Sequence, residues 1–250
     1  MSIIATDLDG TIFKGQTLID GVKEGLLEII NEGIEIYYTT NNSSQTSSEI
    51  KDKLENLLQL NIDISKIITP LVIFQNLYSD SKSNIYIYGS DNLKKYIKNL
   101  NVNLTSLENS ELVLIGRKEE NNNTEINEII KNVSLGKNIL CLNKDLTFPT
   151  EYGEKPGNGA VVKIIEDALS INIPTLGKSG NHYSSYFIQN KIPIDFVIGD
   201  RVDTDIIFGK NLNAKTFLVS SGVKNFLNVN IADIQLNKFS DVVPFLTKHS

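Results

Sequence analysis

Four acidic side chains stand at places in the sequence where they can share one site. Asp7 and Asp9 follow the short apolar run Ile3–Ala5, which predicts a buried strand that ends in a turn. Residues two apart on an extended chain point to the same side, so both carboxylates can face one pocket. Asp200 and Asp205 follow a second apolar run, in the string GDRVDTD. Carboxylates gathered in this way can bind a cation, act as nucleophiles or exchange protons.

The charge of such a group limits how it can exist. Two like charges about 4 Å apart repel by roughly 4 kcal/mol at an effective dielectric constant near 20. The summed repulsion of several such pairs exceeds the net stability of a typical fold, so bound protons or a divalent cation must offset these charges. The chain places no His or Cys among these carboxylates, and hard oxygen ligands favour Mg²⁺. We therefore expect Asp7, Asp9, Asp200 and Asp205 to form a magnesium site.

A second set of residues is suited to binding phosphate oxygens. The hydroxyl of Thr40, the amide of Asn41, the ammonium of Lys178 and the backbone N–H of Leu8, directly after Asp7, can each donate a hydrogen bond. Thr39 is an alternative to Thr40, although adjacency to Asn41 favours Thr40. Asp203 is likewise an alternative to Asp205; we expect Asp203 to cap the helix that starts near it, or to pair with Arg201.

The elements that must position these residues alternate between strands and helices. Apolar runs predict strands at 34–38, 67–69, 194–198 and 216–219 in addition to the first strand. Helical periodicity predicts helices at 21–32, 45–58 and 183–190, with Ser43 or Ser44 as the N-cap of the second. This alternation predicts a doubly wound parallel α/β sheet. Carboxyl ends of parallel strands share one edge, which brings the candidate residues into one crevice.

The middle of the chain repeats the strand and helix pattern without such a constellation. Its predicted strands lie at 84–88, 112–115 and 139–142, with helices at 92–100, 124–133 and 159–169. We expect residues 81–173 to form an inserted α/β domain, and residues 1–80 and 174–250 to form the core. Asn143 and Asp145 lie in the insert, and we expect them to shape it rather than to touch a ligand.

Composition excludes several classes of function. The chain has 250 residues, of which 40% are hydrophobic and 22% charged, as in ordinary globular proteins. A formal net charge of −6 does not indicate a nucleic-acid partner. Cys141 is the single cysteine, so no intrachain disulfide can form, and its apolar neighbours predict a packed thiol. No apolar run approaches the roughly 18 residues of a membrane helix, and Met1 is followed directly by the first strand; we expect a cytoplasmic protein.

The motifs also resemble those of a known family. DLDGT at 7–11, TN at 40–41, GK at 177–178 and GDxxxTD at 199–205 resemble, in order, the four motifs of haloacid dehalogenase (HAD) superfamily phosphatases. The insert lies between the second and third motifs, as in that superfamily's type C2 cap. The strings TTNNSSQT, LNKD and PGNGA resemble subfamily IIA, which includes 4-nitrophenyl, phosphoglycolate and pyridoxal-phosphate phosphatases. Two positions depart from it: Ser179 follows the lysine where proline is usual, and Cys141-Leu142-Asn143 stands for Ala-Thr-Asn.

The resemblance implies a role for each residue. Asp7 would be the nucleophile that forms an aspartyl-phosphate, and Asp9 the general acid and then base. Thr40 and Lys178 would hold the phosphate, and the last acidic motif would hold Mg²⁺. The substrate would be a small phosphorylated metabolite, and a homodimer stays open because such caps sometimes dimerise in relatives.

Three other functions use the same residues. A phosphotransferase or mutase differs only in whether a hydroxyl outcompetes water for the phosphoryl group. A catalytically idle phospholigand-binding protein requires a broken motif, and all motif positions are intact. A dehalogenase leaves Asp9 without a role. A phosphatase is therefore the expected function.

Overall fold

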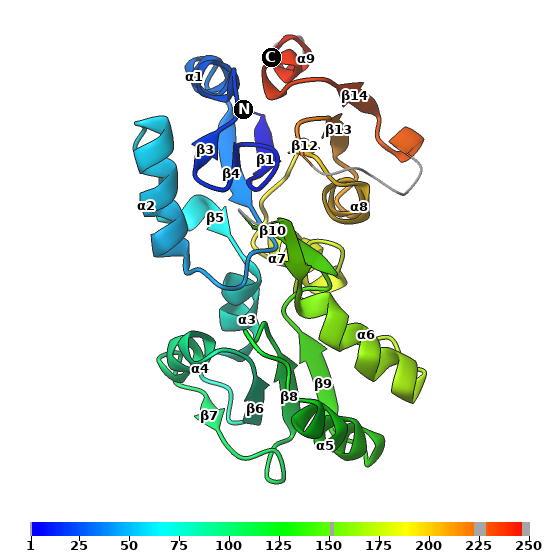
Figure 1. Cartoon of the computed structure of the whole chain (residues 1–250). Coiled ribbons are helices and arrows are strands. Elements are labelled where there is room, and N and C mark those ends of the chain that lie inside the picture. The colour runs from blue at the N-terminus through cyan, green and yellow to red at the C-terminus, as the bar shows by residue number, and fades with distance from the viewer. Residues whose placement is uncertain (1, 151–152, 223–228, 247–250) are drawn as a thin grey trace. The chain divides into compact units, whose positions relative to one another are not determined.

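The computed structural model describes residues 2–150, 153–222 and 229–246, and the chain folds into two compact units (Figure 1). The first unit comprises residues 1–40, 45–69 and 183–250, and the second comprises 41–44 and 70–182. The fold is the expected one, a doubly wound α/β unit with a second α/β unit inserted in its chain. The domain boundaries expected at 80/81 and 173/174 stay predictions.

The first unit contains a six-stranded parallel sheet in the order β14-β13-β12-β1-β4-β5. The strands are β1 (Ile3–Asp7), β4 (Glu35–Thr39), β5 (Ile67–Ile68), β12 (Phe196–Gly199), β13 (Lys215–Val219) and β14 (Ile234–Leu236). Starting from β1, the chain builds the sheet outward through β4 and β5 and later, on the other side, through β12, β13 and β14. The direction of winding therefore changes between β1 and β12, where open α/β sheets bind their ligands.

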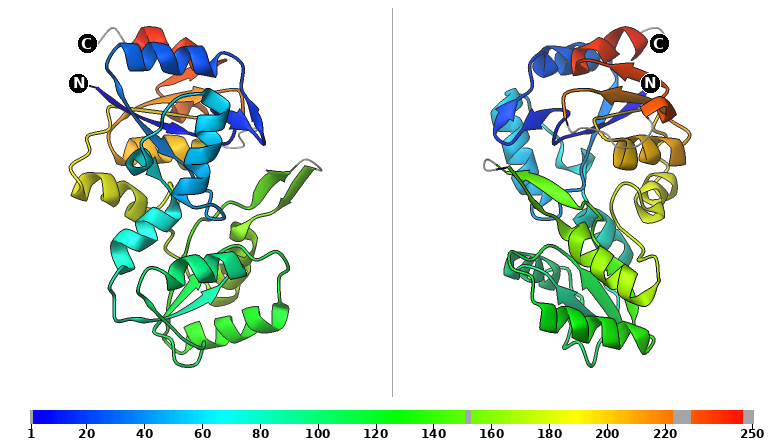
Figure 2. Two further views of the ribbon diagram at one scale, coloured as in Figure 1. Left: turned by 90° about the vertical axis from the view of Figure 1, so that its left-hand side faces the viewer. Right: turned by 45° about the vertical axis from the view of Figure 1, so that its right-hand side comes forward.

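Helices cover both faces of this sheet (Figure 2). The helices are α1 (Val22–Asn31), α2 (Ser47–Leu58), α7 (Asn181–Gln189), α8 (Ile207–Asn211) and α9 (Val243–Leu246). On one face, Leu26 of α1, Leu54 of α2 and Leu246 of α9 belong to the same buried cluster as Ile4 of β1. On the other face, the ring of Phe208 packs against Tyr183 and Phe187, with centroids 5.2 and 5.3 Å apart.

The start of α2 differs from the expectation. Thr46, not Ser43 or Ser44, caps this helix: its hydroxyl accepts a hydrogen bond from the Glu49 N–H, and the Glu49 carboxylate accepts one from the Thr46 N–H. This reciprocal capping box satisfies two backbone donors at once, which a serine without an acidic residue three positions later cannot do.

The second unit contains a four-stranded parallel sheet in the order β7-β6-β8-β9. Its strands are β6 (Asn84–Tyr88), β7 (Asn103–Leu104), β8 (Leu112–Ile115) and β9 (Asn138–Cys141), with helices α3 (Pro70–Tyr78), α4 (Asp91–Lys98), α5 (Asn123–Ser134) and α6 (Asn158–Leu169). Cys141 is packed in its core as expected, and burial raises the pKa of the thiol to about 12.

Several short elements were not expected from the sequence. A hairpin joins β2 (Phe13–Lys14) to β3 (Thr17–Leu18). A second hairpin joins β10 (Thr147–Thr150) to β11 (Gly153–Pro156), and β7 and β14 are further additions. Unlike the equally short β5 and β8, these strands have no continuous apolar run, so a single sequence gives little sign of them. Among the described residues, no helix combines the length and apolar character that crossing a membrane requires.

Asp233 holds the edge strand β14 to its neighbour β13. Its carboxylate accepts hydrogen bonds from the N–H and hydroxyl of Thr216, at 2.8 and 2.7 Å, and from the Lys210 ammonium, at 2.6 Å. Partial burial by itself would raise the pKa of Asp233, but these hydrogen bonds outweigh it and lower the pKa to about 2. A carboxyl group with a depressed pKa in the fold stabilises the protein above its unfolded pKa, near 4.

We predict that Asp233→Asn lowers the stability of the protein at neutral pH and that the difference fades in acid. After discounting for solvent screening, we expect a loss of about 1 kcal/mol, or about 2–4 °C in melting temperature. The difference should shrink as the pH falls from 4 to 2, because the wild-type carboxylate then also becomes protonated. Thermal melts of both proteins across this range measure it.

Asp167→Asn is the matched control, because Asp167 pairs with Lys163 in an exposed ion pair of the second unit. Such a pair contributes little, so this variant should melt close to wild type at every pH. A difference for Asp233→Asn that stays constant down to pH 2 would contradict the assignment of the effect to this carboxylate.

Candidate active site

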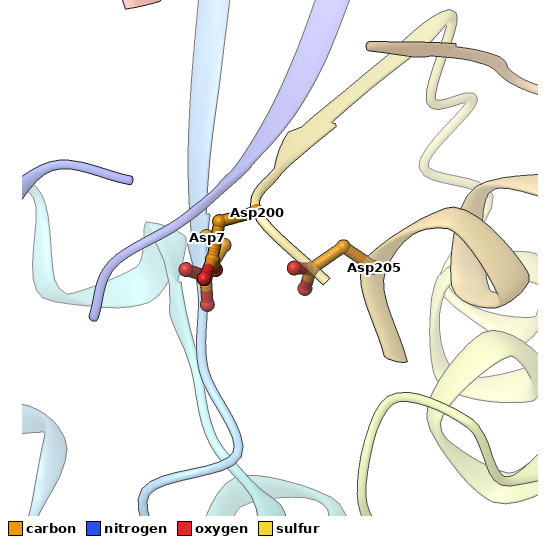
Figure 3. A group of neighbouring side chains, drawn as sticks. All are labelled: Asp7, Asp200 and Asp205. Atoms are coloured by element: carbon orange, nitrogen blue, oxygen red, sulfur yellow. The ribbon is translucent and has the colours of Figure 1, made fainter. Parts of the chain in front are cut away.

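Three of the predicted carboxylates lie together in the first unit (Figure 3). Asp7 ends β1, Asp200 directly follows the neighbouring strand β12, and Asp205 lies in the π-helical turn Val202–Ile206 that comes next. One ligand oxygen from each lies within 4.8 Å of the others, and the three residues are 6%, 0% and 1% exposed. The sequence predicts four carboxylates at one site, and the structure brings these three together.

The turn after β12 holds Asp205 toward the other two residues. The Arg201 N–H donates a hydrogen bond of 3.0 Å to Asp205 Oδ2, and the Asp205 N–H donates back to the Arg201 carbonyl at 3.1 Å. The Arg201 guanidinium forms two hydrogen bonds with Asp203, as expected for this pair. The N-cap residues of this turn and of α8 are Arg201 and Ile206, so the expected role of Asp203 as a helix cap is wrong; Asp203 forms the ion pair with Arg201 instead.

Three glycines let the backbone approach these carboxylates. A Cβ atom on Gly222 would lie 1.8 Å from Asp200 Oδ2, and one on Gly10 would lie 2.6 Å from the same oxygen. A Cβ atom on Gly199 would lie 2.3 Å from the Asp205 carboxylate. Any other residue at these positions would displace the carboxylates. Sequence reasoning missed Gly222, although its place just after β13, at the same edge of the sheet, is a usable signal.

Asp9 lies beside this group rather than in it. Its side chain is exposed, and it is not one of the three residues that lie within 4.8 Å of each other in the described part of the chain. The backbone of Asp9 forms an isolated β-bridge with that of Phe13. The Lys53 ammonium lies over the Phe13 ring, 3.5 Å from its centroid. Burial lowers the pKa of Lys53, and the negative charge of Asp9 opposes that shift. An exposed carboxyl group can exchange protons with a ligand or with solvent.

The predicted phosphate-binding residues of the first unit lie at strand ends. Thr40 follows β4 and is 2% exposed, and its N–H donates to the Ile68 carbonyl of the next strand. Thr39 instead uses its hydroxyl within the sheet, donating to the Thr6 carbonyl at 3.2 Å. Leu8 begins the loop after Asp7, and its carbonyl accepts hydrogen bonds from three successive N–H groups that wind the loop tightly.

Asn41 and Lys178 belong to the second unit, where they contact each other. The Lys178 N–H donates a 2.8 Å hydrogen bond to Asn41 Oδ1, and Asn41 Nδ2 donates to Asp145 Oδ1 at 2.9 Å. Lys178 is 1% exposed, which is unusual for a lysine. The expected roles of Asn41, Lys178, Leu8 and Thr40 toward phosphate stay predictions.

The carboxylate group fits a divalent cation. Its members offer oxygen atoms alone, and three charges held this close in a buried place repel each other strongly unless a cation lies among them. Oxygen-rich sets of this kind suit Mg²⁺ and similar hard cations, whereas zinc and copper sites usually contain His or Cys.

Two family models match the chain. Residues 4–103 match the model described as haloacid dehalogenase-like hydrolase, and residues 189–236 match a HAD-hydrolase-like model. The first match includes Asp7, Asp9, Thr40 and Asn41, and the second includes Asp200 and Asp205.

Similar proteins are phosphatases by name. An acid sugar phosphatase from Staphylococcus haemolyticus is 29% identical over 237 residues, which cover 92% of this chain and 89% of that protein. One from Staphylococcus epidermidis is 27% identical over 234 residues, covering 91% and 90%. These alignments span both units.

Solved structures share the fold along almost the whole chain. A p-nitrophenyl phosphatase from Archaeoglobus fulgidus superposes with a TM-score of 0.86 at 20% identity, covering 98% of both chains. A thermostable NPPase variant from Geobacillus stearothermophilus gives 0.83 at 25% identity, covering 96% of both. A glycerol phosphate phosphatase from Mycobacterium tuberculosis, solved in complex with magnesium, gives 0.76 at 23% identity over 89% of this chain and 69% of that one.

We predict opposite effects of Asp200→Asn without and with a divalent cation. In EDTA the variant should melt at a higher temperature than wild type, because one of three mutually repelling charges is gone. Adding Mn²⁺ as the probe should stabilise wild type by mass action. The variant should need at least about a tenfold higher Mn²⁺ concentration for the same rise in melting temperature. Thermal melts across a Mn²⁺ titration measure both effects.

Asp203→Asn is the control for that titration, since it removes a charge from the same turn but outside the group. It should keep the response of wild type to Mn²⁺. If Asp200→Asn melts below wild type in EDTA, repulsion among the three carboxylates does not destabilise the metal-free protein.

We also predict that Gly222→Ala weakens Mn²⁺ binding by about tenfold or more, because its Cβ displaces the Asp200 carboxylate. Gly33→Ala is the control: Gly33 has a φ of +73°, and a Cβ there meets nothing within 4 Å. That variant should lose about 1 kcal/mol of stability from backbone strain while keeping the metal affinity.

Calorimetric titration with Mn²⁺ distinguishes the Gly222→Ala and Gly33→Ala variants. Equal affinities for Gly222→Ala and wild type would show that the close approach of Gly222 to Asp200 does not affect metal binding.

Proposed function

The chain belongs to the haloacid dehalogenase-like hydrolases as a phosphomonoesterase, and on that premise we propose that it is a Mg²⁺-dependent phosphatase acting through an aspartyl-phosphate on Asp7. The observation that supports this mechanism best is the group of three buried carboxylates at the switch point of the sheet. Asp7, the member at the end of the central strand β1, is the proposed nucleophile.

The proposed reaction has two displacements. In the first, an Asp7 carboxylate oxygen bonds to phosphorus while the bond from phosphorus to the leaving oxygen breaks, and Asp9 gives that oxygen its proton. In the second, Asp9 takes a proton from water as the water oxygen bonds to phosphorus, and the bond to Asp7 breaks to release inorganic phosphate. The exposed position of Asp9 supports this role, since the leaving group must enter and depart.

The other residues hold the phosphate and the cation. We propose that the Leu8 N–H, the Thr40 hydroxyl and Lys178 contact the non-bridging oxygens, as their motif positions imply; for Asn41 this role stays a prediction of the sequence. The cation would be held by the set predicted from the sequence, Asp7, Asp9, Asp200 and Asp205, with the three buried members as its centre. When bound, Mg²⁺ would supply positive charge that offsets the phosphate dianion.

The named relatives narrow the substrate class. Acid sugar phosphatases are the relatives with 27–29% identity, and a glycerol phosphate phosphatase shares the fold. We propose that the substrate is a small sugar or polyol phosphate. A net charge of −6 supports a small ligand rather than nucleic acid. A cytoplasmic location without membrane attachment, and a homodimer, stay predictions of the sequence.

We predict that Asp7→Asn abolishes turnover of 4-nitrophenyl phosphate, by about 1,000-fold or more, because the amide cannot accept the phosphoryl group. Asp20→Asn, which changes a carboxylate that is 97% exposed, is the control and should keep wild-type turnover. Phosphate release in Mg²⁺ and in EDTA measures both. Turnover by Asp7→Asn within tenfold of wild type would remove Asp7 as the nucleophile.

We predict that Asp9→Asn affects poor leaving groups more than good ones. An alkyl phosphate such as glycerol phosphate needs its leaving oxygen protonated, whereas 4-nitrophenolate leaves without help. The value of kcat/KM covers the first displacement alone, so it should fall about 100-fold for the alkyl ester and at least tenfold less for the aryl ester. Equal losses on both substrates would contradict a general-acid role for Asp9.

A further inference from the structure

The side-chain amide of Asn41 is held from both ends within the second unit. Its oxygen accepts the Lys178 N–H at 2.8 Å, and its nitrogen donates to Asp145 Oδ1 at 2.9 Å. The sequence predicts that this amide binds phosphate. A carboxylate 2.9 Å from the amide nitrogen disfavours a second anion there, because like charges repel at this range.

Asp145 is itself fixed by its neighbours. Its N–H donates to Asn143 Oδ1 at 3.2 Å, and Asn143 Nδ2 donates to the Asn41 carbonyl at 2.9 Å and to Ser43 Oγ at 3.2 Å. Asn158 Nδ2 in turn donates to the Asn143 carbonyl at 2.8 Å. Asn143 and Asn158 are both buried, so this network has little freedom to rearrange.

Close backbone packing adds to this rigidity. A Cβ atom on Gly177 would lie 2.9 Å from Asn41 Oδ1, and one on Gly157 would lie 2.2 Å from the Asp145 carbonyl. A Cβ on Gly159 would lie 2.2 Å from the Lys144 carbonyl. The glycines of the GK and PGNGA strings therefore allow three segments far apart in the sequence to meet around Asn41.

We propose that Asn41 and Asp145 are positioning residues for Lys178, and that the Asn41 side chain does not bind the phosphate. Lysine carries its charge on a flexible four-carbon chain, so its aim depends on how firmly its backbone is held. Asn41 holds that backbone through the Lys178 N–H, and Asp145 orients the Asn41 amide so that its oxygen faces Lys178. The proposal rests on the proposed function, in which Lys178 contacts the substrate phosphate.

Exchanging the two side chains tests the proposal. Asn41→Asp alone sets two carboxylates against each other; we expect kcat/KM for 4-nitrophenyl phosphate to fall, and the inhibition constant of inorganic phosphate to rise, by about 10- to 100-fold. In the double variant Asn41→Asp with Asp145→Asn, the carboxylate at 41 still accepts the Lys178 N–H, and the amide at 145 donates to it. Both constants should then return to within about fivefold of wild type.

A phosphate-binding Asn41 gives the opposite result in the double variant. A carboxylate at position 41 would then repel the substrate whatever stands at 145, so the double variant would bind phosphate no better than Asn41→Asp. That outcome overturns the proposal.

Asn42→Asp is the matched control for charge. It adds one negative charge to the same loop and keeps the oxygen that accepts the Ser44 N–H at 2.8 Å. It should bind inorganic phosphate within about threefold of wild type. A loss equal to that of Asn41→Asp would assign the effect to loop charge and overturn the proposal.

Melting temperatures show whether each variant is folded. If the double variant does not fold, Asp145→Asn alone serves, because its amide oxygen can still accept from Asn41 and should keep phosphate affinity, whereas Asp145→Ala should lose it. Equal affinities for these two would contradict the proposal. Absence of turnover by the wild-type enzyme would reject the proposed function, while phosphate binding by the variants would still test the positioning role.

Discussion

The backbone of the first unit must hold three carboxylates together against their mutual repulsion, those of Asp7, Asp200 and Asp205. No attraction among these side chains brings them together, so the backbone must do it. Adjacent parallel strands supply two of them: Ala5 pairs with Val197 and Thr6 with Ile198, and Asp7 and Asp200 follow these pairs. The third comes from a turn closed by hydrogen bonds between Arg201 and Asp205. The sheet and this turn together hold charges that would otherwise separate.

The winding of the sheet explains why the group lies where it does. At most places along a parallel sheet, the connection leaving one strand covers the end of its neighbour. Between β1 and β12 the connections leave in opposite directions, so the strand ends are left open to a ligand. At this edge, the missing side chains of Gly10 and Gly222 leave room for Asp200. Thr40 lies at the same edge, directly after β4, which neighbours β1 on the opposite side from β12.

Sequence reasoning succeeded where charge and strand position agree. An apolar run followed by an acidic residue predicts both a strand and a residue at its carboxyl end, which is how Asp7 and Asp200 could be placed. Asp205 could be preferred over Asp203 by spacing, and the structure shows why: Asp203 pairs with Arg201 instead. The exposure of Asp9 could not be predicted, because it depends on the path of one loop, which periodicity does not encode. The cap at Thr46 and the approach of Gly222 to Asp200 were missed, although the Thr-x-x-Glu pattern and a glycine just after β13 are usable signals.

Neutral side-chain amides in the second unit join segments of the chain by hydrogen bonds, whereas the carboxylates of the first unit repel each other. Segments around Asn41, Asn143 and Lys178 come from distant parts of the chain, and side-chain amides join the backbone of one segment to that of another. An asparagine can accept and donate at once, so Asn41 and Asn143 each satisfy groups on two different segments. A fully satisfied polar network of this kind fixes one arrangement, because any shift leaves a buried group without its hydrogen bond. Motif asparagines can therefore occur at phosphatase sites because they define the shape of a loop, and an asparagine beside a phosphate-binding threonine is not by that position alone a phosphate ligand.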